Sequence, residues 1–308
     1  MSIEKDNILK EIIWLRMSQI YINEFYKDGK FKIPVHLALG HESIAVAVDH
    51  AMEEEDSLFL THRNIHYNLA RLKSIKEDLE EYLLKDSGLG RSFLGSMNLH
   101  NIEKNIAYTS SILGNNLCVG SGYAFGNKVK GNSGVTFIVT GDGAIEEGAF
   151  YESLLFLCSS KLPSLIIVEN NEWSLGTKIN ERRGNIDLKS LSESLGSSYF
   201  SLKGNDPFDY LTQIQSFREI AVNQSIPVVV EVELTTLGHW ILQNEANPEG
   251  KFINYHAGPA PEVSLKKEYP ILDESSRDPL YVLKNYISRE ELLKIAENQI
   301  AIIEGEFK

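Results

Sequence analysis

The sequence has few cysteines, a deficit of positive charge and no long hydrophobic run. Cys118 and Cys158 are its two cysteines, and without a CxxC pair they fit a reduced cytosolic protein with buried thiols better than a disulfide scaffold. Lysine and arginine number 30 against 43 acidic residues, and this net charge of −13 argues against non-specific binding to nucleic acid or anionic membranes. No apolar run reaches the roughly 18 residues of a membrane span, and the early acidic residues do not fit a signal peptide. We therefore expect a cytoplasmic protein that binds neither nucleic acid nor membranes.

The centre of the chain alternates between strand-like and helix-like patterns. Short β-branched, apolar runs at 135–140, 164–168 and 227–234 predict buried strands, and helical periodicity at 145–160 and 207–224 predicts the helices between them. Strands that are apolar on both faces are typical of parallel sheets covered by helices on both sides, so the pattern predicts an α/β fold.

The two ends of the chain add helices and irregular stretches. A long loop in a compact protein is usually functional, so the loop predicted over 86–112 is a candidate part of a site. No shift in composition marks a linker, and we expect one α/β domain over 1–308 with a C-terminal extension over about 241–308. The further predicted helices are 7–27, 43–53, 74–85 and 289–305, and the predicted irregular stretches are 86–112 and 241–285.

The turn Gly141-Asp142-Gly143-Ala144 follows the first central strand. Ligands of open α/β sheets bind outside the carboxyl ends of the strands, and glycines allow the backbone to approach a ligand closely. The helix that follows presents free N–H groups to an anion, typically phosphate. A carboxylate such as Asp142 beside a phosphate needs a cation between them, which suggests Mg²⁺. Such turns are common, so this motif alone is weak evidence.

A second motif, Asn170-Asn171, follows the next predicted strand. Residues 144–169 hold one helix and one strand, so Asn171 is expected at the end of the neighbouring parallel strand, near Asp142. An amide oxygen and a carboxylate there would form a cation site of hard oxygen ligands. Gly-Asp-Gly followed at this interval by Asn-Asn is the fingerprint of thiamine diphosphate (ThDP) enzymes.

Further motifs occur in the order and at about the intervals of one protein family. They are HLALGHESIAVAV (36–48), FLTHRNIHYNLARL (59–72), GSMNLH (95–100), ILGNNLCVGSGYAFGNK (112–128), GDGAIEEGAF (141–150), LPSLIIVENNEWSLGT (162–177) and TTLGHW (235–240). Over roughly residues 14–280 the chain thus resembles the α subunit of ThDP-dependent 2-oxo acid dehydrogenases, the E1 component of the pyruvate, branched-chain and acetoin dehydrogenase complexes. The resemblance implies the ThDP-binding fold of that family, with ThDP and Mg²⁺ as cofactors.

The resemblance also implies a role for each matching residue of the metal site. Asp142, the side chain of Asn171 and the backbone carbonyl of Trp173 would bind Mg²⁺. The backbone of Gly143 and Ala144 would contact the diphosphate.

The remaining matches imply contacts with the rest of the cofactor. Arg63 would pair with the terminal phosphate, for which its planar, charged fork is well suited, and His62 would hydrogen-bond the same group. The backbone of Leu113 would touch the aminopyrimidine. His239 would be the catalytic histidine, able to donate to an oxyanion or to move a proton. The predicted cofactor-binding residues are thus His62, Arg63, Leu113, Gly141, Asp142, Gly143, Ala144, Asn171, Trp173 and His239.

The chain departs from the family pattern in three places. Ile65 stands where the family often has a histidine, Asn98 replaces the histidine of Gly-Ser-Met-His, and Trp240 replaces the serine of Gly-His-Ser. The last change removes a serine that is phosphorylated in some members, and it predicts a bulky ring at the mouth of the site. Because these changes lie where substrate and partner loops meet, the sequence supports the cofactor assignment more strongly than any assignment of a standard substrate such as pyruvate.

The resemblance further implies a partner, because the glutamate that activates the aminopyrimidine lies on the family's β subunit. We expect an α₂β₂ heterotetramer and an isolated chain that is inert. The leading hypothesis is decarboxylation of a 2-oxo acid, with transfer to a lipoyl-bearing acyltransferase or another acceptor. One alternative is a ThDP-dependent carboligase or transketolase-like transferase acting on an aldehyde or a sugar-derived substrate. The other is a non-catalytic paralogue, against which the matching site residues argue.

Overall fold

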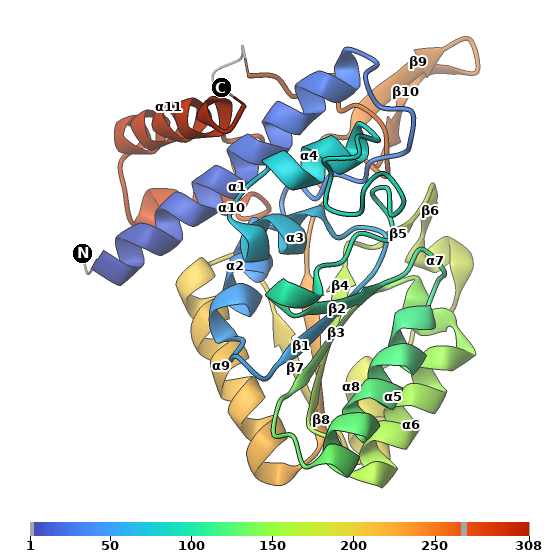
Figure 1. The fold of residues 1–308 in the computed structure, drawn as a ribbon. Helices are drawn as coiled ribbons and strands as arrows, with labels where there is room; N and C mark the ends of the chain where they lie inside the picture. Colours follow the sequence, from blue (N-terminus) through green and yellow to red (C-terminus); the bar gives the residue numbers. More distant parts are fainter. Residues whose placement is uncertain (1–2, 266–269, 308) are drawn as a thin grey trace.

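The computed structural model describes residues 3–265 and 270–307, so positions 266–269 and 308 of the predicted C-terminal extension lie outside the described residues. Its centre is a six-stranded parallel sheet in the order β2-β1-β3-β4-β8-β7 (Figure 1). The chain runs from β1 outward to β2 and then returns to the other side of β1 with β3, so the strand order reverses between β1 and β3. The strands are β1 (Ser57–Leu60), β2 (Ile106–Thr109), β3 (Thr136–Gly141), β4 (Ser164–Asn170), β7 (Ser198–Leu202) and β8 (Pro227–Glu233).

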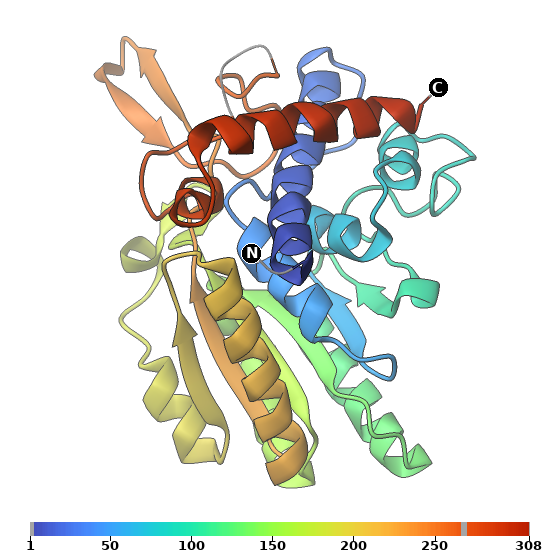
Figure 2. The same ribbon diagram turned by 90° about the vertical axis from the view of Figure 1, so that its left-hand side faces the viewer.

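Helices cover both faces of the sheet (Figure 1). On one face α5, α6 and α8 enclose a core that includes Phe59, Ile138 and Phe150, and α2 and α9 cover the other face. Beyond α2 lies a further layer of α1 and α11, and Figure 2 shows α11 lying across α1. No described helix is long and apolar enough to cross a membrane. The helices are α1 (Ile3–Lys27), α2 (Glu42–Ala51), α3 (Ile65–Leu72), α4 (Lys76–Tyr82), α5 (Asn115–Lys130), α6 (Gly148–Ser160), α7 (Ile179–Arg182), α8 (Leu188–Leu195), α9 (Pro207–Gln224), α10 (Pro279–Val282) and α11 (Arg289–Gly305).

The parallel α/β architecture predicted from the sequence is confirmed, and two helices have the predicted bounds. Helix α9 begins at Pro207 because the side chain of Asp206 accepts hydrogen bonds from the first free N–H groups and the fixed φ of proline suits the first helical position. Helix α11 begins after Ser288, whose hydroxyl accepts from the N–H of Glu291 at 3.1 Å.

Three expectations are wrong in part. The predicted loop 86–112 contains β2 and a short 3₁₀ helix (Ile102–Lys104), because a four-residue edge strand leaves little periodicity. The predicted irregular stretch 241–285 contains a hairpin of β9 (Trp240–Asn244) and β10 (Asn247–Ile253), which projects from the body in Figures 1 and 2 and has no buried face to leave a pattern. Cys118 is exposed on α5 and Cys158 is half-buried, so the thiols are not both buried.

A buried ion cluster ties the N-terminal helix to the first residue of α2 and to the residue before α10. Arg16 of α1 donates from Nε to Oε1 of Glu42 at 2.7 Å and from Nη2 to Oδ1 of Asp278 at 2.9 Å, and all three side chains are fully buried. Glu42 also accepts from the N–H of Gly40 at 2.9 Å. The cluster therefore fixes the turn that follows His36 and precedes α2.

Candidate active site

A cavity of about 390 Å³ lies at the carboxyl ends of β1, β3 and β4. It sits beside the point where the strand order reverses, which is where open α/β sheets bind their ligands. Segments 61–63 after β1 and 140–144 at the end of β3 line it, with loop residues around them. The predicted site residues that line it are His62, Arg63, Leu113, Gly141, Asp142, Gly143, Ala144, Asn171 and Trp173.

Asp142 is one of two buried acidic residues that line this cavity, with 2% of its surface exposed. Its Oδ2 accepts from Nη2 of Arg182 at 2.8 Å, and its N–H donates to the carbonyl of Glu169 at 3.3 Å. Burial raises the pKa of Asp142, and the opposing effects of Arg182 and of the backbone N–H of Asn171 are smaller. The structure therefore places Asp142 and Asn171 on the wall of one cavity and places a cation beside Asp142.

Asn171 and Trp173 follow β4 on the same side of the sheet. Oδ1 of Asn171 accepts from the N–H of Trp173 at 3.0 Å, and its Nδ2 donates to Oγ1 of Thr236 at 2.9 Å, so both ends of the amide are oriented. Carboxylate, amide and carbonyl oxygens are the hard ligands that Mg²⁺ prefers. Gly143 is needed beside them, because a Cβ there would come within 2.8 Å of Oγ of Ser174. These residues fit a magnesium ion that bridges the protein to a phosphate.

Arg63 is the buried cation of the cavity, with 7% of its surface exposed. In the described part of the chain its guanidinium donates to two backbone carbonyls, those of Leu37 and, at 3.1 Å, His256. Burial lowers the pKa of Arg63, as expected for a charge that has left water without a bonded carboxylate. A phosphate would supply the missing negative charge, so this residue fits its predicted role.

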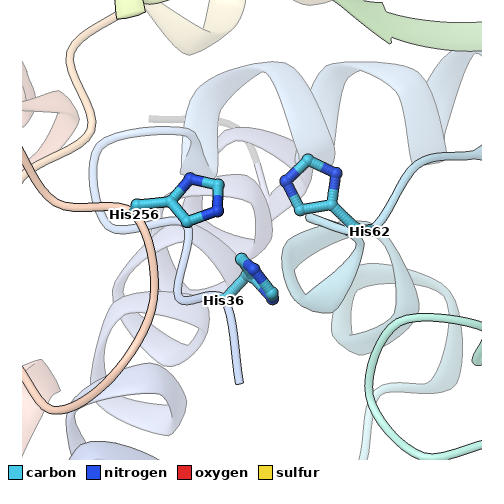
Figure 3. Close-up of side chains that lie close together, drawn as sticks. All are labelled: His36, His62 and His256. Carbon is cyan, nitrogen blue, oxygen red and sulfur yellow. The ribbon is translucent and has the colours of Figure 1, made fainter. Parts of the chain in front are cut away.

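Three histidines gather next to Arg63, and Figure 3 shows the rings of His36, His62 and His256 facing a common centre. The ring of His36 lies 4.7 Å from that of His62 and 4.9 Å from that of His256 between centroids. Burial, together with the charge of Arg63, lowers the pKa of His36 to about 2, of His62 to about 3 and of His256 to about 4. Nδ1 of His36 is buried without a hydrogen-bond partner among the described residues. Because a fixed cation lies beside these neutral rings, the cluster favours an anionic or hydroxyl-bearing ligand over a metal ion.

A second buried group lies at the base of the cavity. Oε1 of Glu169 accepts from Nε2 of His66 and from the hydroxyl of Tyr67, both at 3.0 Å, and Oε2 lies 3.4 Å from Nδ1 of His41. Burial raises the pKa of Glu169, but its contacts with the two histidines outweigh burial and hold the pKa below its ordinary value. This carboxylate is therefore satisfied within the protein and supports the floor of the site.

The tenth predicted residue, His239, does not line the cavity. It is exposed at the start of the β9–β10 hairpin, with its ring 4.8 Å from that of Phe252. Trp240 likewise packs against the main core and does not form the mouth of the site. The chain returns from the hairpin with His256, and this histidine occupies the cavity instead.

Sequence reasoning misses four residues of the site. His36 begins the HLALGHESIAVAV motif but the resemblance assigns it no role, His256 lies in a segment without a local pattern, and only the three-dimensional fold brings the two together. Glu169 could have been found from its position directly before Asn170-Asn171. Arg182 has no signal in the sequence, since its neighbour Arg183 is equally basic.

Comparison with known proteins gives a family and a fold. The family described as Dehydrogenase E1 component matches residues 10–239. The pyruvate dehydrogenase E1 component subunit alpha of Rickettsia bellii is 26% identical and covers 96% of this chain and 87% of its own length. The same subunit of Rickettsia prowazekii is 29% identical over 73% of this chain and 69% of its own length.

The fold is also found in a solved structure. The crystal structure of transketolase from Campylobacter jejuni matches 99% of this chain with a TM-score of 0.60 and 16% sequence identity. The chain spans about half of that transketolase, 48% of its length. At this identity the match shows a shared fold.

Proposed function

Since the chain belongs to the dehydrogenase E1 component family, we propose that it is the α subunit of a 2-oxo acid dehydrogenase that uses ThDP and Mg²⁺. In this role it is an oxidoreductase subunit that decarboxylates a 2-oxo acid and passes the remaining unit to a lipoyl group or another acceptor. We further propose that residues 1–308 act as one ThDP-binding domain that holds the diphosphate.

One observation carries this proposal: two buried groups of opposite charge line the same cavity, at the ends of neighbouring strands. Asp142 follows β3 and is paired with Arg182, which a metal ion could replace, and Arg63 follows β1 and has no bonded carboxylate among the described residues. A magnesium ion bound to a diphosphate supplies both charges in one ligand.

The residues of the chain would hold this group as follows. Asp142, Asn171 and the carbonyl of Trp173 would bind the metal, and the N–H groups of Gly143 and Ala144 would receive the diphosphate. When bound, ThDP supplies the carbanion-stabilising centre that a decarboxylation needs.

The other half of the cavity would bind the terminal phosphate and the reacting group. Arg63 and His62 would hold the phosphate, and Leu113 would lie against the aminopyrimidine. We assign to His256, in place of His239, the task of donating to a developing oxyanion or moving a proton, because it lies in the cavity and its imidazole is neutral.

A second chain is needed to complete the site, and the surface next to the cavity supports this part of the proposal. Ile112 and Leu113 line the cavity and are exposed, and exposed apolar side chains continue along α5 and α6. Contiguous apolar patches of this kind mark protein contacts. We propose that a β subunit that carries the activating glutamate covers this face in an α₂β₂ assembly. The exposed apolar residues of α5 and α6 are Val119, Tyr123, Phe125, Val129, Leu155 and Phe156.

The first test measures cofactor binding to the full-length chain by calorimetry, with and without Mg²⁺. Asp142→Ala should abolish the Mg²⁺-dependent part of ThDP binding, because an oxygen ligand beside the phosphate is lost. Asp187→Ala is the matched control, since this exposed aspartate caps α8 away from the cavity. Unchanged ThDP affinity in Asp142→Ala would reject the metal assignment.

A second candidate function is a transketolase-like or carboligase reaction on a hydroxylated substrate. The observation in its favour is the cluster of His36, His62 and His256, whose ring nitrogens could bind hydroxyl groups. The assay that separates the two functions uses the chain co-expressed with a β subunit. Reduction of a lipoyl acceptor in the presence of 2-oxo acids supports the dehydrogenase, and formation of a carbon–carbon bond with aldehydes supports the ligase.

A further inference from the structure

Arg182 places a positive charge against Asp142, the carboxylate assigned to the metal. Its Nη2 donates to Oδ2 of Asp142 at 2.8 Å, its Nε to Oε1 of Glu146 at 3.0 Å, and its Nη1 to the carbonyl of Thr177 at 2.8 Å. The side chain of Arg182 is only 12% exposed. All three nitrogens of the guanidinium are thus engaged, which is more than a mobile surface side chain would show.

The segment that carries Arg182 lies directly over the Gly141–Ala144 turn. It consists of the small hairpin of β5 (Trp173–Ser174) and β6 (Thr177–Lys178), followed by the single turn of α7. Ser174 packs so tightly on Gly143 that a Cβ there would come within 2.8 Å of its Oγ. The bridge between Arg182 and Asp142 therefore fastens the segment containing Trp173 across the turn.

Mg²⁺ and the guanidinium of Arg182 cannot both use this carboxylate oxygen. Two cations against one buried carboxylate also repel each other strongly, because the surrounding dielectric is low. Asp142 has only 2% of its surface exposed, so its carboxylate would be costly to leave unpaired.

We propose that Arg182 is a built-in substitute for the metal: it neutralises Asp142 in the metal-free chain and is expelled when Mg²⁺ enters with ThDP. This inference rests on the proposed function, because it assumes that Asp142 is a metal ligand. Molecules in which Arg182 is paired with Asp142 do not accept metal. The apparent affinity for Mg²⁺ is therefore the intrinsic affinity multiplied by the fraction of molecules in which Asp142 is free of Arg182. Arg182 is then a positioning residue that also makes metal binding depend on the simultaneous arrival of the diphosphate.

The neighbouring residue Arg183 provides a matched control. Its Nε donates to the same Oε1 of Glu146 at 3.0 Å, but it does not contact Asp142. A substitution of Arg183 therefore removes one charge and one ion pair with Glu146 and leaves the bridge to Asp142 in place.

The experiment uses the full-length chain, freed of metal by EDTA and of cofactor by dialysis. The affinity for Mg²⁺ at saturating ThDP is measured by calorimetry for the wild type, Arg182→Gln, Arg182→Met, Arg182→Lys and Arg183→Gln. Binding of Mn²⁺ alone, followed by electron paramagnetic resonance, gives a readout that needs neither ThDP nor activity. Circular dichroism and the cofactor-induced rise in Tm identify folded variants, and Arg182→Met serves if Arg182→Gln does not fold.

We expect the two neutral variants at position 182 to bind Mg²⁺ about tenfold more tightly than the wild type, as if one molecule in ten were competent before the change. They should also bind Mn²⁺ in the absence of ThDP. Arg182→Lys and Arg183→Gln should stay within about threefold of the wild type, because the competing charge remains.

The possible results distinguish failure of the role proposed for Arg182 from failure of the proposed ThDP function. Equal Mg²⁺ affinity in all variants would overturn the role of Arg182 and leave the ThDP function intact. Weaker binding in the neutral variants would also overturn it and would place Arg182 among the phosphate-binding residues. Absence of Mg²⁺–ThDP binding in every protein, wild type included, would refute the proposed function and this inference with it.

Discussion

Arg16 and Arg63 are two buried arginines with opposite electrostatic surroundings. Substitution by methionine should therefore change the free energy of unfolding in opposite directions at the two positions. Arg16 lies between the carboxylates of Glu42 and Asp278, so Arg16→Met leaves two buried carboxylates without their cation. Breaking a buried pair in this way lowers the free energy of unfolding by about 3–5 kcal/mol. Arg63 has no such partner among the described residues, and Arg63→Met removes a buried cation whose desolvation costs several kcal/mol.

The two carbonyls that lose Arg63 as a donor oppose this gain by about 1 kcal/mol each. We therefore expect Arg63→Met to raise the free energy of unfolding of the cofactor-free chain by about 1 kcal/mol. ThDP affinity should fall at least about 100-fold, because two charged hydrogen bonds of about 1.5 kcal/mol each are lost.

Urea denaturation at neutral pH in EDTA, without ThDP, measures both free energies of unfolding. Arg71→Met is the surface control: Arg71 pairs with Asp49 at 2.7 Å in a partly exposed position, and its loss should change stability by less than about 1 kcal/mol. If Arg63→Met loses as much stability as Arg16→Met, the charge of Arg63 is satisfied within the protein, and the argument that it awaits an anion fails.

Three further predictions concern the cavity and its rim. His256→Ala should lower turnover of the assembled enzyme by about 10²–10⁴-fold while His239→Ala leaves it near the wild-type rate, and the reverse order in a steady-state assay would return the role to His239. The pKa values of His36, His62 and His256 are about 2, 3 and 4, below the ordinary 6.5. The unfolded chain therefore binds more protons than the folded chain, and the free energy of unfolding falls as the pH drops from about 6.5 to 4. His62→Asn should reduce that slope by about one proton in urea titrations at pH 7, 6 and 5, and an unchanged slope would contradict the neutral cluster. Phe125→Asp on α5 should prevent co-purification with a β subunit and leave ThDP binding unchanged, and an intact complex would exclude this face.

The metal half of the site could be predicted because its geometry follows from local rules. The strands that end at Gly141 and Asn170 are short, apolar and β-branched, and a helix of suitable length joins them. Such a unit places its two parallel strands side by side with their carboxyl ends at one edge. Asp142 and Asn171 are therefore expected close together, and in the structure both line the same cavity.

The histidine half could not be predicted, because it depends on the path of segments without a repeating pattern. His239 and His256 flank the β9–β10 hairpin, and only the fold decides which of them reaches the cavity. Gly238 has a φ of +96°, and from there the chain turns into the hairpin, with His239 at its exposed start. The family motif assigns the catalytic role to His239, and the structure shows that His256, not His239, lines the cavity.

The balance of buried charges distinguishes the groups that stabilise the fold from those that bind ligand. Arg16 and Glu169 are matched by fixed partners on other elements, so removing any member damages the protein and no external ion is required. Among the described residues no carboxylate bonds to Arg63, which donates to two backbone carbonyls and lies over the ring of Tyr255, and the ion pair of Asp142 is with an arginine on a single helical turn. A chain that keeps two such charges at the ends of adjacent strands gives up stability unless a ligand completes them. One ligand explains both features. A phosphate with a bound cation would pair with Arg63 and would replace Arg182 at Asp142.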